Sequence, residues 1–167
     1  MTTTDTGERR RPVVLGPGEG ESVWFLNSRM TLKATGATTG GGYGLLESSI
    51  PPGFSPPMHV HHREDESFYV LEGQLRLQCG DETFVAEAGS YIFLPREVPH
   101  SFRVEGDTPA RMLTIETPGG GERFFVDAGR PVEGEGLPDA APVDVELLRR
   151  VGNAYGAEVV GPPLGAR

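Results

Sequence analysis

The sequence predicts an all-β protein, an antiparallel sandwich or barrel built from many short strands. Glycine (24) and proline (15) are abundant and only 37% of the 167 residues are hydrophobic, a mixture typical of turn-rich β folds. Short strand-like runs also follow one another closely, with Gly, Pro, Asp or Asn between most of them. The length suits a single domain.

Eleven runs of residues are expected to form the strands. Each run is short, as in antiparallel sandwiches and barrels. A Gly/Thr-rich loop is expected at 35–42. In order, the predicted strands are 23–26, 30–34, 43–50, 58–62, 67–71, 74–79, 83–86, 91–94, 100–104, 110–116 and 123–126.

Composition also divides the chain into segments. Asp144 is a candidate N-cap for a helix that would run to about Tyr155 and pack outside the barrel. The expected segments are a disordered tail (1–12), the β-barrel (13–128), a Pro/Gly linker (129–142) and a C-terminal helix and tail (143–167).

Charge and cysteine content narrow the classes of partner and location. A net charge of −9 disfavours binding to nucleic acid. Cys79 is the only cysteine, so no internal disulfide forms. No apolar run resembles a signal peptide or a membrane span, and we expect a cytoplasmic protein with no membrane partner. A single lysine, Lys33, among fifteen basic residues is typical of a GC-rich bacterial genome.

The histidines carry the chemistry. His59 and His61 occupy positions i and i+2 of one predicted strand and so share a face, whereas His62 points the other way. A short turn would bring Glu66 back beside them, and His100 begins a later strand. Three imidazoles and a carboxylate suit one divalent transition metal ion, which could be Ni, Fe, Mn, Co, Cu or Zn. We therefore predict His59, His61, Glu66 and His100 as metal ligands.

The spacing around these ligands resembles the two motifs of the cupin superfamily. The first motif is matched by Gly53, five further residues, His59-x-His61, four further residues, Glu66, six further residues and Gly73. The second motif is matched by Gly89, five further residues, Pro95 and His100. The chain departs from this motif at Glu97, where the family usually has Gly, and at Val104, where it usually has Asn. Fifteen residues separate the motifs, as in compact microbial cupins.

Within the superfamily, the chain resembles the small quercetin 2,3-dioxygenase-like cupins. The resemblance extends from the strand that contains Trp24, through HHREDESFYVLEG and FLPREVPHSFR, to the Gly-Pro-Pro-Leu sequence at 161–164. It implies a jelly-roll barrel with a metal ion inside, and often a homodimer.

Other side chains near the motifs are weighed by strand parity. Phe68 and Val70 share parity with Glu66, and Phe102 shares parity with His100, so these three could line a substrate cavity. Weaker candidates for the same wall are Tyr43, Met58 and Phe93. We interpret Glu64 and Asp65 as acids of the turn, and Cys79 as an inert buried thiol.

The resemblance makes a dioxygenase the first functional hypothesis. Its substrate would be a flavonol-like or other enolic or phenolic aromatic molecule, dioxygen the co-substrate, and Glu66 both ligand and general base. The same site could instead serve a non-redox polyketide cyclase or isomerase. A non-enzymatic small-molecule-binding cupin is the third hypothesis.

Overall fold

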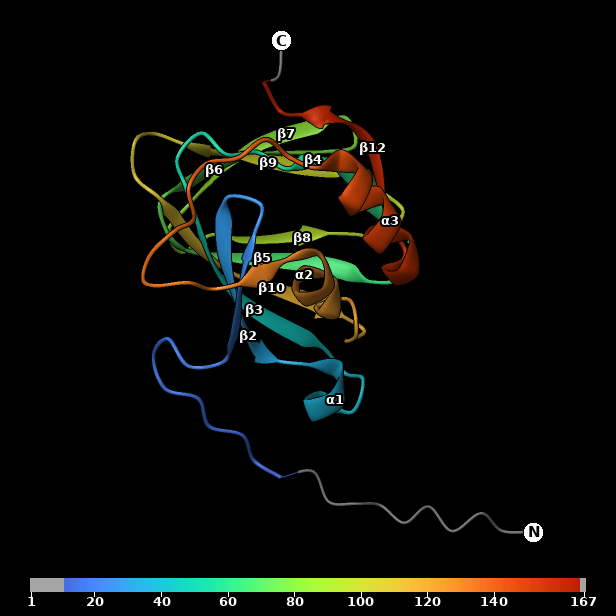
Figure 1. Cartoon of the computed structure of the whole chain (residues 1–167). Helices are drawn as coiled ribbons and strands as arrows, with labels where there is room; N and C mark the ends of the chain where they lie inside the picture. The colour runs from blue at the N-terminus through green and yellow to red at the C-terminus, as the bar shows by residue number, and fades with distance from the viewer. Residues whose placement is uncertain (1–10, 166–167) are drawn as a thin grey trace, which may run out of the picture.

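The computed structural model describes residues 11–165, whose strands form two antiparallel sheets (Figure 1). The larger sheet contains β1 (Glu21–Phe25), β2 (Ser28–Ala34), β3 (Gly44–Ile50), β5 (Asp65–Glu72), β8 (Tyr91–Leu94), β10 (Ala110–Thr117) and β11 (Arg130–Pro131). The smaller sheet contains β4 (Pro57–His61), β6 (Gln74–Cys79), β7 (Glu82–Glu87), β9 (His100–Glu105) and β12 (Ala157–Pro163).

The strand order is that of a jelly roll and confirms the predicted all-β barrel. In the larger sheet the order is β11-β1-β2-β3-β10-β5-β8, and in the smaller sheet it is β12-β4-β9-β6-β7. Strands far apart in the sequence are therefore neighbours, as where β10 pairs with both β3 and β5. The predicted tail at 1–12 lies outside the described residues except for Arg11 and Pro12.

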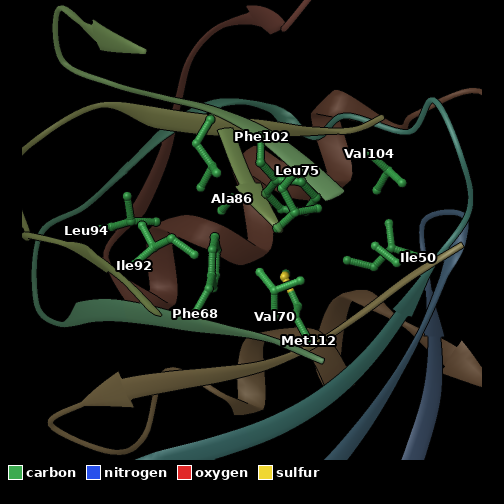
Figure 2. Packing of buried hydrophobic residues seen from close by; sticks show 12 residues of the cluster. Ile50, Phe68, Val70, Leu75, Ala86, Ile92, Leu94, Phe102, Val104 and Met112 are labelled. Atoms are coloured by element: carbon green, nitrogen blue, oxygen red, sulfur yellow. The ribbon is translucent and has the colours of Figure 1, made fainter. Parts of the chain in front are cut away.

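The core lies between the sheets because side chains alternate between the two faces of each strand. On β3, Leu46 and Ile50 are buried, while Glu47 faces outward and accepts a hydrogen bond from Arg111 at 2.7 Å. Figure 2 shows the inward-facing side chains of both sheets converging. The buried cluster comprises Ile50, Phe68, Val70, Leu75, Leu77, Ala86, Ile92, Leu94, Phe102, Val104, Ala110 and Met112.

Within residues 11–165, three helices accompany the sheets: α1 (Gly36–Thr39), α2 (Arg123–Ala128) and α3 (Val145–Tyr155). The predicted C-terminal helix is confirmed, because Asp144 Oδ1 accepts a hydrogen bond from the Leu147 N–H at 2.9 Å and Gly156 ends the helix with φ 78°. Leu148 joins a second buried cluster with residues of β1, β2 and α2. None of the helices within residues 11–165 is both long enough and apolar enough to cross a bilayer.

The strand predicted at 123–126 is wrong, because these residues begin α2. Phe124 and Phe125 form a short apolar run, and a run of this length fits a buried strand or a buried helix equally well. Both rings pack on Phe25, with centroids 5.4 and 5.1 Å away. The expected loop at 35–42 also contains the single turn of α1, which Thr35 caps.

Two strands lie in segments where the sequence predicted none. β11 falls in the expected linker and pairs with β1, and β12 falls in the expected C-terminal tail and pairs with β4. Figure 1 shows α3 leading directly into β12 beside the smaller sheet. β12 is not evident from the sequence because residues 157–163 contain glycine and proline, which are rare inside strands. The register of β12 shifts between Val159 and Gly161 and again between Gly161 and Pro163.

Several turns of the cupin-like motifs have left-handed backbone conformations, among them those at Gly73 and Glu97. Gly73 has φ 81°, and a Cβ there would lie 2.9 Å from the Ala110 Cα. Glu97, which stands where the motif usually has Gly, has φ 65°. The turn therefore keeps a backbone conformation that glycine favours. Val104, the other departure, is 1% exposed and belongs to the core.

Candidate metal centre

The four predicted ligands come from three strands in both sheets. His59 and His61 lie on β4, and His59 pairs directly with His100 at the start of β9. Glu66 lies on β5 of the larger sheet. The cluster therefore joins the two sheets inside the barrel, where His61, Glu66 and His100 are 7%, 5% and 1% exposed.

One donor atom from each of these side chains lies within 4.8 Å of the other three. The Nε2 atom of His100 is 3.1 Å from Oε2 of Glu66, and Nε2 of His61 is 3.9 Å from the same oxygen. Bonds of about 2.0–2.2 Å from one ion to nitrogen and oxygen would need only a small contraction of this set. The donors thus fit one divalent transition metal ion, and they do not distinguish which metal it is.

The Nδ1 atoms of the three histidines are occupied by other partners. His59 donates from Nδ1 to the carbonyl oxygen of Pro57 at 2.8 Å, and His100 donates to that of Val98 at 3.0 Å. The Nδ1 atom of His61 lies 2.7 Å from Oε1 of Glu64. These bonds fix each ring with Nε2 toward the centre, the arrangement that metal-binding histidines need.

Two of the donors have pKa values that favour metal binding. Burial, with the nearby His100 and His61, lowers the pKa of His59 to about 3, so its Nε2 lone pair is free at neutral pH. Burial would raise the pKa of Glu66, but the hydrogen bond from His100 and the charges of the histidines outweigh it and lower the pKa to about 2. Glu66 is therefore a carboxylate.

His61 differs from these two donors. Burial alone would lower its pKa, but the hydrogen bond to Glu64 and the charges of Glu66 and Glu116 raise it to about 9. Without a metal ion, the His61 ring is therefore protonated on both nitrogens and positively charged at neutral pH. A metal ion would have to displace that proton from Nε2.

Two buried acids near the cluster were missed by the sequence analysis. Glu64, interpreted there as a turn acid, is 3% exposed and accepts a hydrogen bond from the His61 ring. Asp65, by contrast, accepts hydrogen bonds from the exposed guanidinium group of Arg96. Glu116 lies opposite Glu66 in the sheet and is 1% exposed; burial raises its pKa well above the usual value. Glu116 lies an even number of residues after the buried Met112 on β10, so both side chains face inward. This spacing could have predicted from the sequence that Glu116 is buried.

A cavity of roughly 800 Å³, counting the open space at its mouth, extends from the cluster toward α2 and α3. Its lining is mostly apolar, with His59, His61 and Glu66 as the donors that reach it. The remaining lining residues are Phe25, Leu26, Ser28, Met30, Ile50, Phe54, Pro56, Pro57, Phe68, Phe102, Met112, Thr114, Phe124, Phe125, Leu148, Ala157, Glu158 and Val159.

Of the six predicted pocket residues, Phe68 and Phe102 line the cavity, with ring centroids 5.7 Å apart. Val70 is fully buried in the core beside Met112 (Figure 2) but is not a lining residue, and Met58 lies against Gly161 of β12. Tyr43 and Phe93 are not lining residues.

The predictions for Phe93 and Tyr43 are wrong because both residues occupy outward-facing positions. Phe93 is 53% exposed because its partner Ser67 is on the outward face of β5, whereas Ile92 and Leu94 point inward. Tyr43 is 43% exposed and directly precedes β3. His62 also faces outward, as expected, and binds Glu97 and Glu158.

Comparison with known proteins agrees with this geometry. The family model described as "Cupin domain" matches residues 46–116, the stretch that contains all four donors. The polyketide synthase CurC of Streptomyces cyaneus is 34% identical over 107 residues, covering 64% of this chain and 70% of that protein. The chain belongs to the cupin superfamily.

Other cupins resemble it more distantly. Quercetin 2,3-dioxygenase of Bacillus subtilis (strain 168) is 28% identical over 160 residues, which are 96% of this chain but 47% of that protein. The cupin thus spans about half the length of that relative. A Thermotoga maritima structure described as a predicted oxalate decarboxylase superposes with a TM-score of 0.56 at 20% identity, over 62% of this chain and 97% of that one. At that identity the likeness concerns the fold alone.

Proposed function

We propose that this cupin is a metal-dependent dioxygenase that acts on a flavonol-like or other enolic or phenolic aromatic substrate. The observation that carries the proposal is the donor set of three histidines and one glutamate at the end of a largely apolar cavity. The similarity to a quercetin 2,3-dioxygenase over 96% of the chain adds support.

The side chains of the cavity suit a planar substrate. Phe68 and Phe102 meet edge to face beside the donors and present apolar walls to an aromatic ring. Glu66 faces the cavity, so it is placed to accept the proton of an enolic or phenolic hydroxyl group as general base. When bound, the metal ion would supply Lewis-acid stabilisation of the substrate oxygen.

A non-redox cyclase or isomerase is the second candidate, and the similarity to CurC favours it. CurC is the relative that matches at 34% identity, and this chain covers 70% of it. The same base and the same metal site could remove a proton and stabilise an enolate without dioxygen. A cupin that only binds a small molecule is the third candidate, because the donors and cavity do not require turnover.

Oxygen uptake tests the proposal. The apo-protein would be reconstituted separately with Ni, Fe, Mn, Co, Cu and Zn, and each form given a panel of flavonols and other enolisable aromatics. A dioxygenase consumes oxygen in stoichiometric proportion to substrate and requires both a metal ion and Glu66. Substrate turnover that continues without oxygen would overturn it in favour of the cyclase, and unchanged ligand with full metal occupancy would favour the binding protein.

We also propose that the protein is a homodimer. Tyr69, Tyr91 and Phe93 form an apolar surface on the outward side of β5 and β8, where they are 41%, 62% and 53% exposed. Burying such aromatic surface in a two-fold contact would be favourable. Light scattering after size exclusion tests this: a mass near 36 kDa supports the dimer, and 17.9 kDa, the mass of one chain, contradicts it. The cytoplasmic location stays a prediction.

A further inference from the structure

Glu122 is a buried acid outside the cluster of metal donors. It directly precedes α2, and its side chain is 1% exposed. Its Oε1 atom accepts a hydrogen bond from the N–H of Gly36 at 2.8 Å, and its Oε2 atom accepts one from the N–H of Gly120 at 2.6 Å. Hydrogen bonds to an ionised acceptor are stronger than those between neutral groups. The carboxylate therefore joins the start of α1 to the loop between β10 and α2.

The backbone around this carboxylate is closely packed. A Cβ at Gly44, the first residue of β3, would overlap Oε2 of Glu122 and lie 3.0 Å from its Cβ. A Cβ at Gly36 would lie 2.8 Å from the carbonyl carbon of Gly119. Glycine at these positions lets α1, β3 and the loop before α2 meet around one side chain.

The Glu122 side chain does not serve as a cap for its own helix. Although Glu122 occupies the N-cap position of α2, its side chain makes no capping hydrogen bond. One of its two bonds instead reaches Gly36, which is 86 residues away in the sequence. This contact fixes where α2 begins relative to the larger sheet, since α1 connects β2 and β3 of that sheet.

Helix α2 supplies an aromatic part of the cavity wall. Phe124 and Phe125 both line the cavity, and each ring remains partly accessible. The two rings meet edge to face, with centroids 5.4 Å apart, and Phe25 beside them is also a lining residue. Because Phe124 follows Glu122 by two residues, the place where α2 begins determines where these rings lie.

Two further contacts hold α2, and both lie at the surface. Arg123 donates to Oε2 of Glu21 at 2.6 Å, with side chains that are 42% and 50% exposed. Tyr155 of α3 donates to the exposed Asp127. Exposed ion pairs contribute little to stability. Of the acids in these three contacts, Glu122 is the buried one.

We propose that Glu122 is a positioning residue that fixes α2, so that Phe124 and Phe125 form the wall against which the apolar part of a substrate binds. Glu122 acts on the substrate through these two rings and not through the metal ion. That the substrate is aromatic rests on the proposed function, while the position of the wall rests on the hydrogen bonds of Glu122.

The binding test compares two ligands that share one metal-binding group. Both 3-hydroxyflavone and maltol carry a 3-hydroxy-4-keto unit, but maltol lacks the fused benzene ring and the phenyl ring. Dissociation constants would be measured without oxygen on the metal-loaded full chain. Glu122→Gln keeps the volume but turns an NH2 group toward one of the two N–H donors, which should release α2. Binding of 3-hydroxyflavone should weaken roughly 3- to 10-fold, while that of maltol should stay within about 2-fold.

Arg123→Gln is the matched control, because it removes an exposed contact from the adjacent residue of the same segment. It should leave both dissociation constants unchanged. Metal affinity, measured by chelator competition, should equal that of the wild type in both variants, since neither side chain belongs to the donor cluster. Flavone binding that weakens equally in Glu122→Gln and Arg123→Gln would overturn the special role of Glu122.

A double-mutant cycle tests whether Glu122 acts through the rings. A protein with Phe124→Ala and Phe125→Ala should itself bind 3-hydroxyflavone more weakly, and adding Glu122→Gln should cause no further loss. Phe124→Leu and Phe125→Leu, which retain more of the apolar volume, serve the same cycle if the alanine protein does not fold. Losses that add would show that Glu122 acts by another route and would overturn the proposal. A purely structural role would lower Tm without producing this coupling.

The outcomes separate the positioning role from the dioxygenase. Weaker flavone binding in Glu122→Gln, without oxygen uptake by the wild type, supports the positioning role and contradicts the dioxygenase. Oxygen uptake by the wild type, with unchanged flavone binding in Glu122→Gln, supports the dioxygenase and contradicts the positioning role. Equal losses for 3-hydroxyflavone and maltol, or a wild type that binds neither, would overturn the proposal.

Discussion

The Nδ1 atom of His61 and the Oε1 atom of Glu64 are 2.7 Å apart and both side chains are buried. The carboxylate accepts a hydrogen bond from the Nδ1–H group, which leaves Nε2 to face the other donors. Carboxylate–histidine pairs of this kind orient metal ligands and increase their basicity. We therefore expect Glu64 to act as a positioning residue, through His61, for the proposed metal site.

Removing the Glu64 carboxylate should weaken metal binding. Glu64→Ala is expected to lower metal affinity about 10- to 100-fold, and Glu64→Gln less, because its amide oxygen still accepts a hydrogen bond from the Nδ1–H group. Affinity would be measured by competition with a chelator at pH 9, where proton competition at His61 is small in all the proteins.

A matched control exists on the surface. Glu97 accepts from Nδ1 of the exposed His62 at 2.9 Å, so Glu97→Ala removes the same kind of pair outside the metal site. Its metal affinity should equal that of the wild type. If Glu64→Ala behaved like Glu97→Ala, the positioning role would be refuted.

Metal affinity should depend on pH through His61. Its pKa of about 9 in the metal-free protein means that a metal ion competes with a proton below that pH. The apparent affinity should therefore rise about 10-fold per pH unit from pH 7 toward pH 9 and then level off. His59 and Glu66, with pKa values of about 3 and 2, add no slope in this range. Chelator competition at several pH values measures this, and a flat profile between pH 7 and 9 would be inconsistent with a protonated His61.

A side chain at Gly121 should displace the carboxylates of the buried acids beside it. A Cβ at this position would lie 2.7 Å from Oε2 of Glu116 and 3.0 Å from Oε1 of Glu64. Gly121→Ala should displace Glu64 and lower metal affinity, by no more than Glu64→Ala does. Gly42→Ala is the control, since its nearest contact would be the Thr39 carbonyl at 3.4 Å. Equal affinities in the two variants would contradict the expected displacement.

Strand β12 should support the metal centre through β4. Val159 pairs with His59, and Ala157 pairs with His61. A chain truncated after Gly156 exposes the edge of β4, and its free energy of unfolding should fall by at least about 2 kcal/mol, which lowers Tm by roughly 4–8 °C. A chain lacking only 166–167 is the control. Calorimetry and metal titration check both, and an unchanged Tm after the longer truncation would contradict this role.

The strands and the donor set could be predicted because each depends on local spacing. A period of two places His59 and His61 on one face, and the structure brings both beside Glu66 and His100. The first three predicted strands likewise overlap β1 to β3, to within two residues at each end, because turn residues bound them.

The remaining features depend on tertiary contacts that spacing does not reveal. Phe124 and Phe125 became helical because α2 packs on Phe25 and α3. Glu64 and Asp65 are adjacent acids in one turn, yet only the fold decides that the first turns inward to His61 and the second outward to Arg96. Phe93 looked like a cavity wall until its pairing with Ser67 set it on the outer face.

Metal content tests the central claim most directly. Wild type, His59→Ala and His62→Ala would be stripped, reconstituted with the same divalent ion, desalted and measured for bound metal per chain. We predict about one ion in the wild type and in His62→Ala, whose imidazole lies on the outward face, and a clear loss in His59→Ala. Equal metal content in His59→Ala and wild type would contradict the account.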